Sequence, residues 1–322
     1  MRVPARVGLV GNPSDGYGGA VLAAVVDELA AEVTVTPTSS RLRIDTDHHD
    51  AIEWSTPQGF VDDIATRGHP DPVRIVTAAL TVVARHLGGP PPPVHIRCTT
   101  SIPRSVGLAG SSAIATGVVE ALAAIVGEVL DPRVVAALAL RAETDELAIA
   151  AGWQDRIAQA HRRAVLVDAA NPTVADGLTV PGVTVVPPPS GRAVVAWLAG
   201  GAEDSGRYHA ELRRRASAAE VAAVMAELAA LARRAATAAA RGDSTELARA
   251  VEASWSLRRA AMPLRADHDT LVETARRAGG AATSPGSGGS VVALVGDDDA
   301  ASRSVIEALR DAGADTLVVH LR

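Results

Sequence analysis

Aromatic residues are scarce in this chain: they make up 2% of its 322 residues, although 48% of the residues are hydrophobic. The core must therefore be built mainly from alanine, valine and leucine. Cysteine is scarcer still, because Cys98 is the only one. A single cysteine excludes an internal disulfide and any metal site that needs several thiolates. Cys98 lies in a stretch typical of a strand, and we expect it to serve packing and not nucleophilic chemistry.

An excess of positive charge is also lacking. The net charge is −6, so we expect no basic surface of the kind that binds nucleic acid, and no nucleic-acid partner. No run approaches the ~18 consecutive apolar residues that a membrane span needs. The N-terminal segment also lacks the long apolar stretch of a signal peptide. These absences predict a cytoplasmic protein without a membrane partner. The length of 322 residues allows one large or two ordinary domains.

A turn rich in glycine and serine is the most informative stretch that is present. Ser101–Gly117 follows a predicted strand, Val94–Cys98, and leads into a predicted helix, Ile114–Val126. Its glycines let the backbone approach a ligand, and its small residues leave the first N–H groups of the helix open. These groups and the helix dipole favour an anion such as phosphate, and a serine here could ligate magnesium. An ordinary turn with a serine N-cap is the alternative, because neither GxxxxGK[ST] nor GxGxxG occurs.

Two other loops have compositions that suit a ligand. Arg6–Val10 reads as a buried strand, and the loop Gly11–Gly19 that follows is dense in Asn, Ser, Asp and Gly. Such a loop can offer several hydrogen bonds to a polyhydroxy ligand, although a plain crossover turn has the same composition. Near the other end, the glycine-rich Gly279–Ser290 precedes the predicted strand Val291–Val295. It allows a phosphate or another segment to approach very closely.

Acidic residues cluster between these loops. We expect a helix over Arg133–Ala150, on which Glu143 and Glu146 share a face. Either glutamate can reach a magnesium ion held at the serine turn, and a solvated acidic face is the alternative. Asp155 follows a glycine break, where it can act as a general base or simply cap the next helix.

Hydrophobic periodicity and turn residues predict the remaining elements. Strands are expected at Val21–Val26, Glu32–Pro37, Ala164–Asp168, Gly182–Val186, Ala193–Leu198 and Thr316–Leu321. Helices are expected at Val73–Leu87, Ala210–Arg241 (with one or two breaks), Ser244–Arg259, His268–Ala278 and Ser302–Asp311. The prolines Pro187–Pro189 read as a linker into a second region of the chain.

Three of these segments stand in an order that resembles the GHMP kinase superfamily, which includes galactokinase, homoserine kinase and mevalonate kinase. The first is Arg6–Gly19. The second, Pro103–Ala113, is similar to the family's P-x-x-x-G-L-G-S-S-A with one extra residue before the serines. The third, Gly280–Leu294, resembles G-A-x-x-T-G-x-G-x-G-G-x-x-I-A-L, with Ser284 and Pro285 near the usual Thr-Gly. The resemblance spans nearly the whole chain.

Two shorter strings, Ala5–Asp15 and Ala151–Arg156, look most like the glucuronokinase branch of this superfamily. Glucuronokinases phosphorylate the anomeric hydroxyl of D-glucuronate. The Asn-Pro-Ser-Asp sequence at Asn12–Asp15 replaces the Glu-His-x-Asp of galactokinases. The resemblance therefore argues for a uronic acid and against galactose as the acceptor.

The resemblance implies an α+β fold of two domains, residues 1–185 and 186–322, with the active site in the cleft between them. It also implies ATP and Mg²⁺ as cofactors. The nucleotide-binding residues would be Pro103, Gly107, Leu108, Ala109, Gly110, Ser111, Ser112, Ala113, Gly286 and Gly288. The magnesium ligands would be Ser111, Ser112 and Glu143. Glu143 is preferred over Glu146 because its spacing from Asp155 is close to that in relatives.

Two residues would act on the reacting groups. Asp155 would accept the proton of the sugar hydroxyl or only position it, and Arg6 would lower the pKa of that hydroxyl or steady the transferring phosphoryl group. The substrate would contact Asn12, Ser14, Asp15, Gly16, Tyr17, Gln154 and Arg156. A uronate would also need a cation for its carboxylate, and the candidates are Arg156, Arg104 and Arg41.

Two other functional classes stay open at this point. One is a kinase for a different small alcohol, such as another sugar, homoserine or an isoprenoid precursor. The other is a non-catalytic relative that binds a nucleotide or ligand. The retained residues favour catalysis over the second class; they are Arg6, Ser111, Ser112, Glu143 and Asp155.

Overall fold

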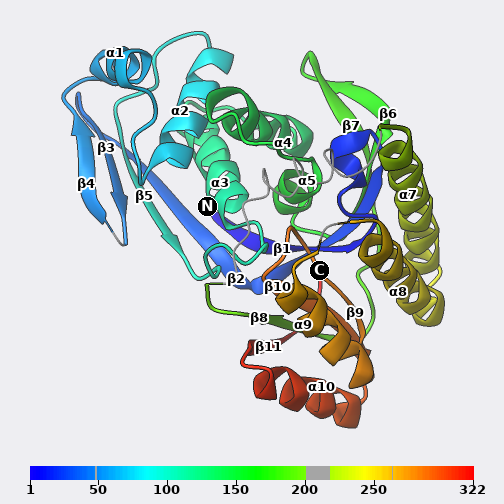
Figure 1. Ribbon diagram of the computed structural model, residues 1–322. Coiled ribbons are helices and arrows are strands. Elements are labelled where there is room, and N and C mark those ends of the chain that lie inside the picture. The colour runs from blue at the N-terminus through cyan, green and yellow to red at the C-terminus, as the bar shows by residue number, and fades with distance from the viewer. Residues whose placement is uncertain (48, 201–217, 263) are drawn as a thin grey trace.

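Two β-sheets flanked by helices make up the molecule (Figure 1). The computed structural model describes residues 1–47, 49–200, 218–262 and 264–322. The strands of the larger sheet come from residues 2–185 and those of the smaller sheet from residues 192–319. This arrangement confirms the α+β class that the sequence predicts.

The larger sheet has seven strands in the order β4-β3-β5-β2-β6-β7, with β1 paired to β2. Its strands are β1 (Arg2–Val10), β2 (Ala20–Pro37), β3 (Leu42–Thr46), β4 (His49–Trp54), β5 (Val94–Thr100), β6 (Val165–Ala175) and β7 (Leu178–Val185). The long β2 is the spine of the sheet, because one end pairs with β6, the other with β5, and β1 pairs along it. All these pairings are antiparallel except that of β3 with β5.

The sequence predicts two strands where β2 is one. It stays extended because β1 pairs with both halves, across a register shift between Pro4 and Ala5. Alternate residues of β2 enter different hydrophobic cores: Val21 belongs to the core shared with the helices after β4, and Leu22 to the core shared with the smaller sheet. A strand buried on both faces needs apolar residues at successive positions, which explains the run Ala20–Val26.

Helices cover one face of the larger sheet (Figure 1). They are α2 (Arg74–His86), α3 (Gly110–Ile125), α4 (Pro132–Arg141) and α5 (Gln154–His161), while α1 (Pro57–Arg67) packs beside β4. The helix α3 lies very close to β2. A Cβ atom added at Gly117 would stand 2.7 Å from Cγ2 of Val33, so only glycine allows this approach.

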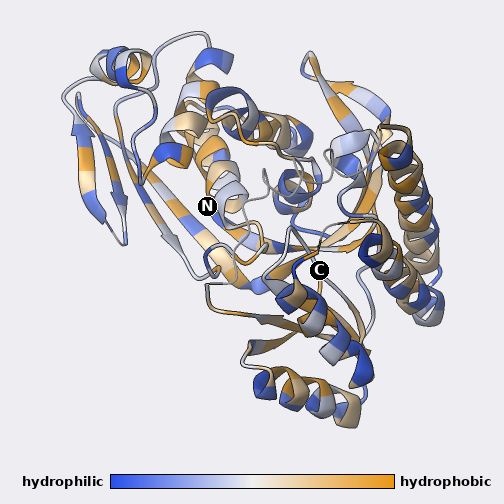
Figure 2. Ribbon diagram, in the orientation of Figure 1, coloured by the Kyte–Doolittle hydropathy of each residue, from blue (hydrophilic) through white to orange (hydrophobic). Residues whose placement is uncertain are grey.

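The smaller sheet has the order β11-β8-β10-β9 and is antiparallel. Its elements are β8 (Arg192–Trp197), β9 (Ala281–Thr283), β10 (Ser290–Gly296) and β11 (Asp315–Val319), with α9 (Ala266–Arg277) and α10 (Asp299–Asp311) against it. The buried residues of α10 are Ser302, Val305 and Leu309, which fall on one helix face. Hydrophilic and hydrophobic segments accordingly alternate along α10 in Figure 2.

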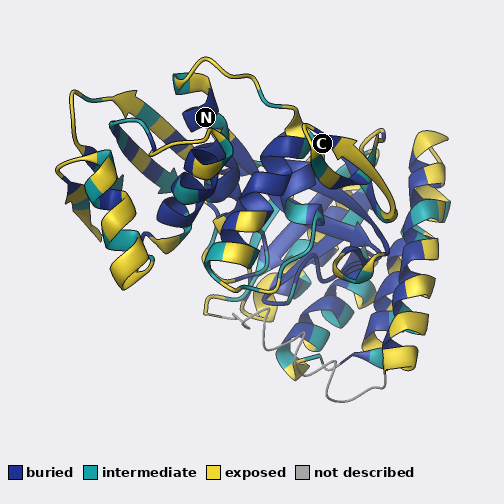
Figure 3. Ribbon diagram, turned by 90° about the horizontal axis from the view of Figure 1, so that it is seen from above, coloured by how far each residue is buried: buried dark blue, intermediate teal, exposed yellow. Residues whose placement is uncertain are grey.

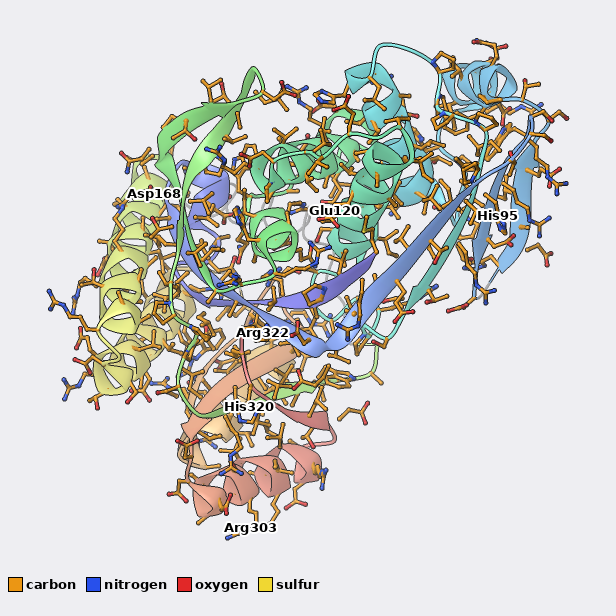
Figure 4. The ribbon with its side chains drawn as sticks, turned by 180° about the vertical axis from the view of Figure 1, so that it is seen from behind. His95, Glu120, Asp168, Arg303, His320 and Arg322 are labelled. Atoms are coloured by element: carbon orange, nitrogen blue, oxygen red, sulfur yellow. The ribbon has the colours of Figure 1, made fainter. Side chains whose placement is uncertain are left out.

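The helices α7 (Ala218–Ala240) and α8 (Ser244–Ala261) join the two sheets. Ala232 of α7 and Val292 of β10 belong to one core together with residues of β1 and β2. Asp168 of β6 accepts two hydrogen bonds of 2.8 Å from Arg233 of α7, and Figure 4 labels Asp168 beside this helix. The outward side of α7 is exposed, whereas the central strands are buried (Figure 3). The small alanine side chains of α7 thus let a long helix lie flat on the sheet.

Most predicted elements are confirmed to within a few residues. The sequence analysis missed β3, β4, β9 and α1, whose short runs carry little periodicity. The predicted helix Arg133–Ala150 is wrong in its second half, because α4 ends at Arg141 and a π-helical turn, Ala142–Glu146, follows. Residues 210–217 of another predicted helix lie outside the described residues. In the described part of the chain no helix is long and apolar enough to cross a membrane.

The tight contact between α3 and β2 leads to a test of the fold. We expect Gly117→Val to lower the free energy of unfolding by about 1–3 kcal/mol, because the added carbons overlap Val33. Chemical denaturation of both proteins measures this difference. Ala124→Val, at an exposed position of the same helix, is the matched control and should cost only a few tenths of a kcal/mol. Equal losses for the two variants would contradict the packing account.

Candidate active site

A cavity of about 1140 Å³ opens where the loops after β1 and β5, the start of α5 and the loop before β10 meet. It collects residues that are far apart in the sequence. Its lining includes Arg6, Asn12, Asp15, Gly16, Tyr17, Pro103, Arg104, Gly107, Leu108, Ala109, Gly110, Ser111, Glu143, Gln154, Asp155, Arg156, Arg258 and Gly286. Most of the residues that the sequence analysis selects are therefore brought together in one place.

The turn before α3 forms one wall of the cavity. Gly107 and Ala109 have positive φ angles of 77° and 63°, and α3 begins directly afterwards at Gly110, earlier than predicted. The first N–H groups of α3 and its dipole thus point toward the cavity side of Gly110 and Ser111. Such a wall suits the phosphates of a nucleotide.

Three predicted nucleotide-binding residues do not line the cavity. Ser112 is fully buried and donates a hydrogen bond of 3.2 Å to the carbonyl of Ala109, and Ala113 is packed in a hydrophobic core. Gly288 lies off the cavity as well, where an added Cβ would stand 2.0 Å from Nδ1 of His268. Of the two predicted serine ligands, only Ser111 lines the cavity.

The loop before β10 lines the cavity next to this turn. A Cβ at Gly286 would stand 2.3 Å from the carbonyl oxygen of Gly107, so the two glycine-rich loops touch through their backbones. The carbonyl of Pro285 accepts hydrogen bonds from the N–H of Gly8, at 3.0 Å, and from the Arg6 guanidinium. Pro285 is thus held by its carbonyl, and the N–H that proline lacks is not needed.

Arg6 and Asp155 form an ion pair at the cavity wall. Nη2 of Arg6 lies 2.6 Å from Oδ1 of Asp155, and their side chains are 5% and 18% exposed. Burial raises the pKa of Asp155 above its ordinary value, the positive charge of Arg6 lowers it, and the nearby Asp15 raises it; the net direction is upward. A buried carboxylate with a raised pKa is a better proton acceptor than a solvated one.

A second charged cluster contains Ser111, Glu143 and Arg156. Oγ of Ser111 donates a hydrogen bond of 3.0 Å to Oε1 of Glu143, while Arg156 pairs with Oε2. Burial lowers the pKa of Arg156 to about 9, so it is still charged at neutral pH. Nη1 of Arg156 also lies 3.4 Å from Asp155, which links the two clusters.

Glu146 takes another direction from Glu143. It pairs with Arg85 and lies 3.2 Å from the ring of His69, away from the cavity. The prediction that the two glutamates share a helix face is therefore wrong, because the π-helical turn replaces the regular helix at these positions.

The loop after β1 contributes a hydrogen-bonded floor. Nε2 of Gln154 donates to Oδ1 of Asn12 at 2.8 Å, and the N–H of Gln154 donates to Oδ2 of Asp15 at 2.8 Å. These bonds fix Asn12 and Asp15 beside the start of α5, where Asp155 follows. Ser14 is different: its buried hydroxyl donates to the carbonyl of Ala20 at 2.7 Å, so it stabilises the loop and does not line the cavity.

Among the lining residues that sequence reasoning missed is a buried cation, Arg258 of α8. Its guanidinium donates to the carbonyls of Ser284 at 2.7 Å and Gly286 at 3.1 Å. The signal was an arginine on the apolar stripe of a predicted helix, three and four residues after the buried Trp255 and Ser254. Of the candidates named for a carboxylate, Arg41 lies off the cavity and pairs with Glu53 at 3.6 Å.

Family models match two parts of the chain. The model described as "GHMP kinases N terminal domain" matches residues 74–163, and "GHMP kinases C terminal" matches residues 235–315. The first match contains the turn before α3 and Asp155, and the second contains Arg258 and the loop before β10. Both glycine-rich loops of the cavity and Asp155 thus fall inside one of the two matches, whereas Arg6 and the loop after β1 lie outside them.

Proteins of similar sequence and solved structures of similar fold are also kinases. The chain is 28% identical to Glucuronokinase 1 of Arabidopsis thaliana over 325 residues, which cover 96% of this chain and 88% of that protein. Its fold is similar to that of Lactococcus lactis galactokinase complexed with galactose, with a TM-score of 0.82, 16% identity and coverage of 99% and 92% of the two chains. Streptococcus pneumoniae phosphomevalonate kinase in complex with phosphomevalonate and AMPPNP is similar too, with a TM-score of 0.79, 14% identity and 99% coverage of both chains. The chain belongs to the GHMP kinase family.

Proposed function

We propose that this protein is an ATP-dependent sugar kinase that phosphorylates the anomeric hydroxyl of a hexuronic acid, D-glucuronate. The observation that carries the proposal is the ion pair of the buried Arg6 with the half-buried Asp155, at the wall of a cavity large enough for a nucleotide and a sugar. The similarity to Glucuronokinase 1 supports the choice of acceptor.

The nucleotide phosphates fit against the turn before α3. Gly107 and Gly110 leave the backbone open there, and the helix dipole favours the negative charge. Ser111 and Glu143 are suited to magnesium, because their neighbouring oxygens supply two ligands of the kind that Mg²⁺ takes alongside phosphates and water. When bound, the ion would neutralise phosphate charge during transfer.

The acceptor hydroxyl fits beside Asp155. Its oxygen attacks the γ-phosphorus, the bond from that phosphorus to the β-phosphate oxygen breaks, and ADP leaves. The hydroxyl proton passes to Oδ2 or Oδ1 of Asp155, whose raised pKa favours this transfer. Arg6 keeps Asp155 in place and offsets the negative charge that gathers on the transferring group. Alignment and charge neutralisation supply most of the rate enhancement in such reactions.

The acceptor is tested by measuring magnesium-dependent ADP release with glucuronate, galacturonate, galactose, homoserine and mevalonate. We expect turnover with glucuronate. Asp155→Asn should then lower kcat by roughly 100- to 10,000-fold, because the amide keeps the shape of the carboxylate but cannot take a proton. The KM for ATP should change little, since the turn before α3 is untouched.

Asp176→Asn is the matched control, because Asp176 is an exposed aspartate at a turn between β6 and β7, and it should keep wild-type rates. Turnover with homoserine or mevalonate but no sugar would contradict the proposed acceptor. Binding of ATP without turnover of any acceptor would indicate a non-catalytic relative instead.

The raised pKa of Asp155 predicts a pH dependence. The reaction needs the carboxylate form, so kcat/KM should fall as the pH is lowered through a pKa above 3.8, the ordinary aspartate value. A pH–rate profile of the wild type measures this acid limb. The residual activity of Asp155→Asn should lack it. The same limb in that variant would assign the titration to another group and remove the role of Asp155 as base.

A further inference from the structure

Arg258 is a buried cation without a carboxylate partner among the described residues. It is 2% exposed, and the groups that accept its hydrogen bonds are two backbone carbonyls, those of Ser284 and Gly286. The other two buried arginines of the cavity are neutralised, because Arg6 pairs with Asp155 and Arg156 with Glu143. Of these three arginines, Arg258 is the one without a carboxylate partner among the described residues.

An uncompensated charge in this position is costly. A guanidinium has five N–H donors, and its burial without an anion removes the hydration of the charge and leaves that charge uncompensated. Nε of Arg258 is buried and has no hydrogen-bond partner in the described structure. The ring of Trp255, 5.7 Å from Cζ, attracts the cation but brings no negative charge. An anion that enters the cavity would supply the missing charge.

The contacts of Arg258 place it beside the loop after β1, the loop to which the proposed function assigns the acceptor. Nη2 of Arg258 and Nδ2 of Asn12 donate to the same oxygen, the carbonyl of Gly286, at 3.1 and 3.3 Å. The same face of α8 holds the loop after β1, since Oγ of Ser254 accepts the N–H of Gly11 at 3.1 Å. Asn12 in turn is bonded to Gln154, the residue before Asp155. Arg258 and Asp155 thus lie on either side of the loop after β1.

We infer that Arg258 binds the carboxylate of the acceptor and makes the enzyme select a uronic acid over the matching neutral sugar. This inference rests on the proposed function. In a hexuronate the anomeric carbon C1 and the carbon C5 that bears the carboxylate are both bonded to the ring oxygen, so the two groups project from neighbouring corners of the ring, and Asp155 and Arg258 border the same loop of one cavity. A sugar with its anomeric hydroxyl at Asp155 can therefore direct its carboxylate toward Arg258, whose planar fork suits a bidentate contact.

Other cations in the cavity suit the carboxylate less well. The sequence contains no lysine. Arg104 lines the cavity but is exposed, so water screens its charge. Arg74 is also exposed and lies 3.5 Å from Asp71. Arg258 alone combines burial, a place in the lining and the absence of a carboxylate partner among the described residues.

The test compares glucuronate with glucose, which has a neutral CH₂OH in place of the carboxylate. The quantity measured is the ratio of kcat/KM for the two sugars, determined on one preparation of each variant. Unfolded protein cancels in this ratio. Arg258→Met should lower the ratio on the order of 100-fold, the effect of removing one partner of a buried charge pair. Arg258→Lys should lower it less, because it keeps the charge but loses the fork.

Arg259→Met is the matched control: Arg259 is next in the sequence, about half exposed and paired with Asp269. Its ratio should equal that of the wild type.

An unchanged ratio in Arg258→Met, or a larger loss in Arg104→Met, would overturn the inference. Equal losses with both sugars and a raised KM for ATP would also overturn it and assign Arg258 to the phosphates. If Arg258→Met has no measurable activity, the ratio for Arg258→Lys is compared with that of the wild type, and an unchanged ratio would overturn the inference. Turnover of neutral sugars only, by the wild type, would overturn the proposed acceptor itself.

Discussion

The guanidinium of Arg6 is the point on which the candidate site depends. It is buried on β1, pairs with Asp155 at 2.6 Å and donates to the carbonyl of Pro285, while Gly107 lies 3.5 Å from the same Nη1. One side chain therefore ties together segments that lie 101 and 279 residues away in the sequence. A buried charge must be surrounded by such partners to be stable, so the ion pair and the loop geometry require each other.

The fold makes this convergence possible because β1 and β2 are buried on both faces. Alternate residues of β2 enter two cores, one under α2–α5 and one shared with α7, α8 and the smaller sheet, and the apolar residues of β1 belong to the second. The loops at the ends of these strands consequently meet at a single cavity. Small residues permit the closest contacts: Gly117 brings α3 onto β2, and Gly286 brings the last loop against Gly107. The scarcity of aromatic residues thus corresponds to close packing of alanine, valine and glycine.

Local patterns were enough to single out the three loops as candidates, because glycine-rich turns between apolar runs are local signals, whereas the role expected of Asp155 came from the resemblance to a family. Local patterns were not enough to orient single side chains. Ser14 and Ser112 stand in the right loops, yet their hydroxyls bond to nearby carbonyls instead of the cavity. Glu143 and Glu146 take different directions because both lie in a π-helical turn, and this turn has no signature in the sequence. Arg258 was missed because the features that make it a candidate are not local in the sequence. It contacts residues 26 and 28 positions later, and no described carboxylate pairs with it.

We propose that this GHMP kinase transfers a phosphoryl group from ATP to the anomeric oxygen of glucuronate. The phosphorus NMR spectrum of the product, taken directly from a reaction of the wild-type protein, tests it most directly. The account predicts a phosphate signal coupled to the anomeric proton, formed in step with ADP. A phosphate on any other sugar oxygen, or ADP formed together with inorganic phosphate alone, would contradict it.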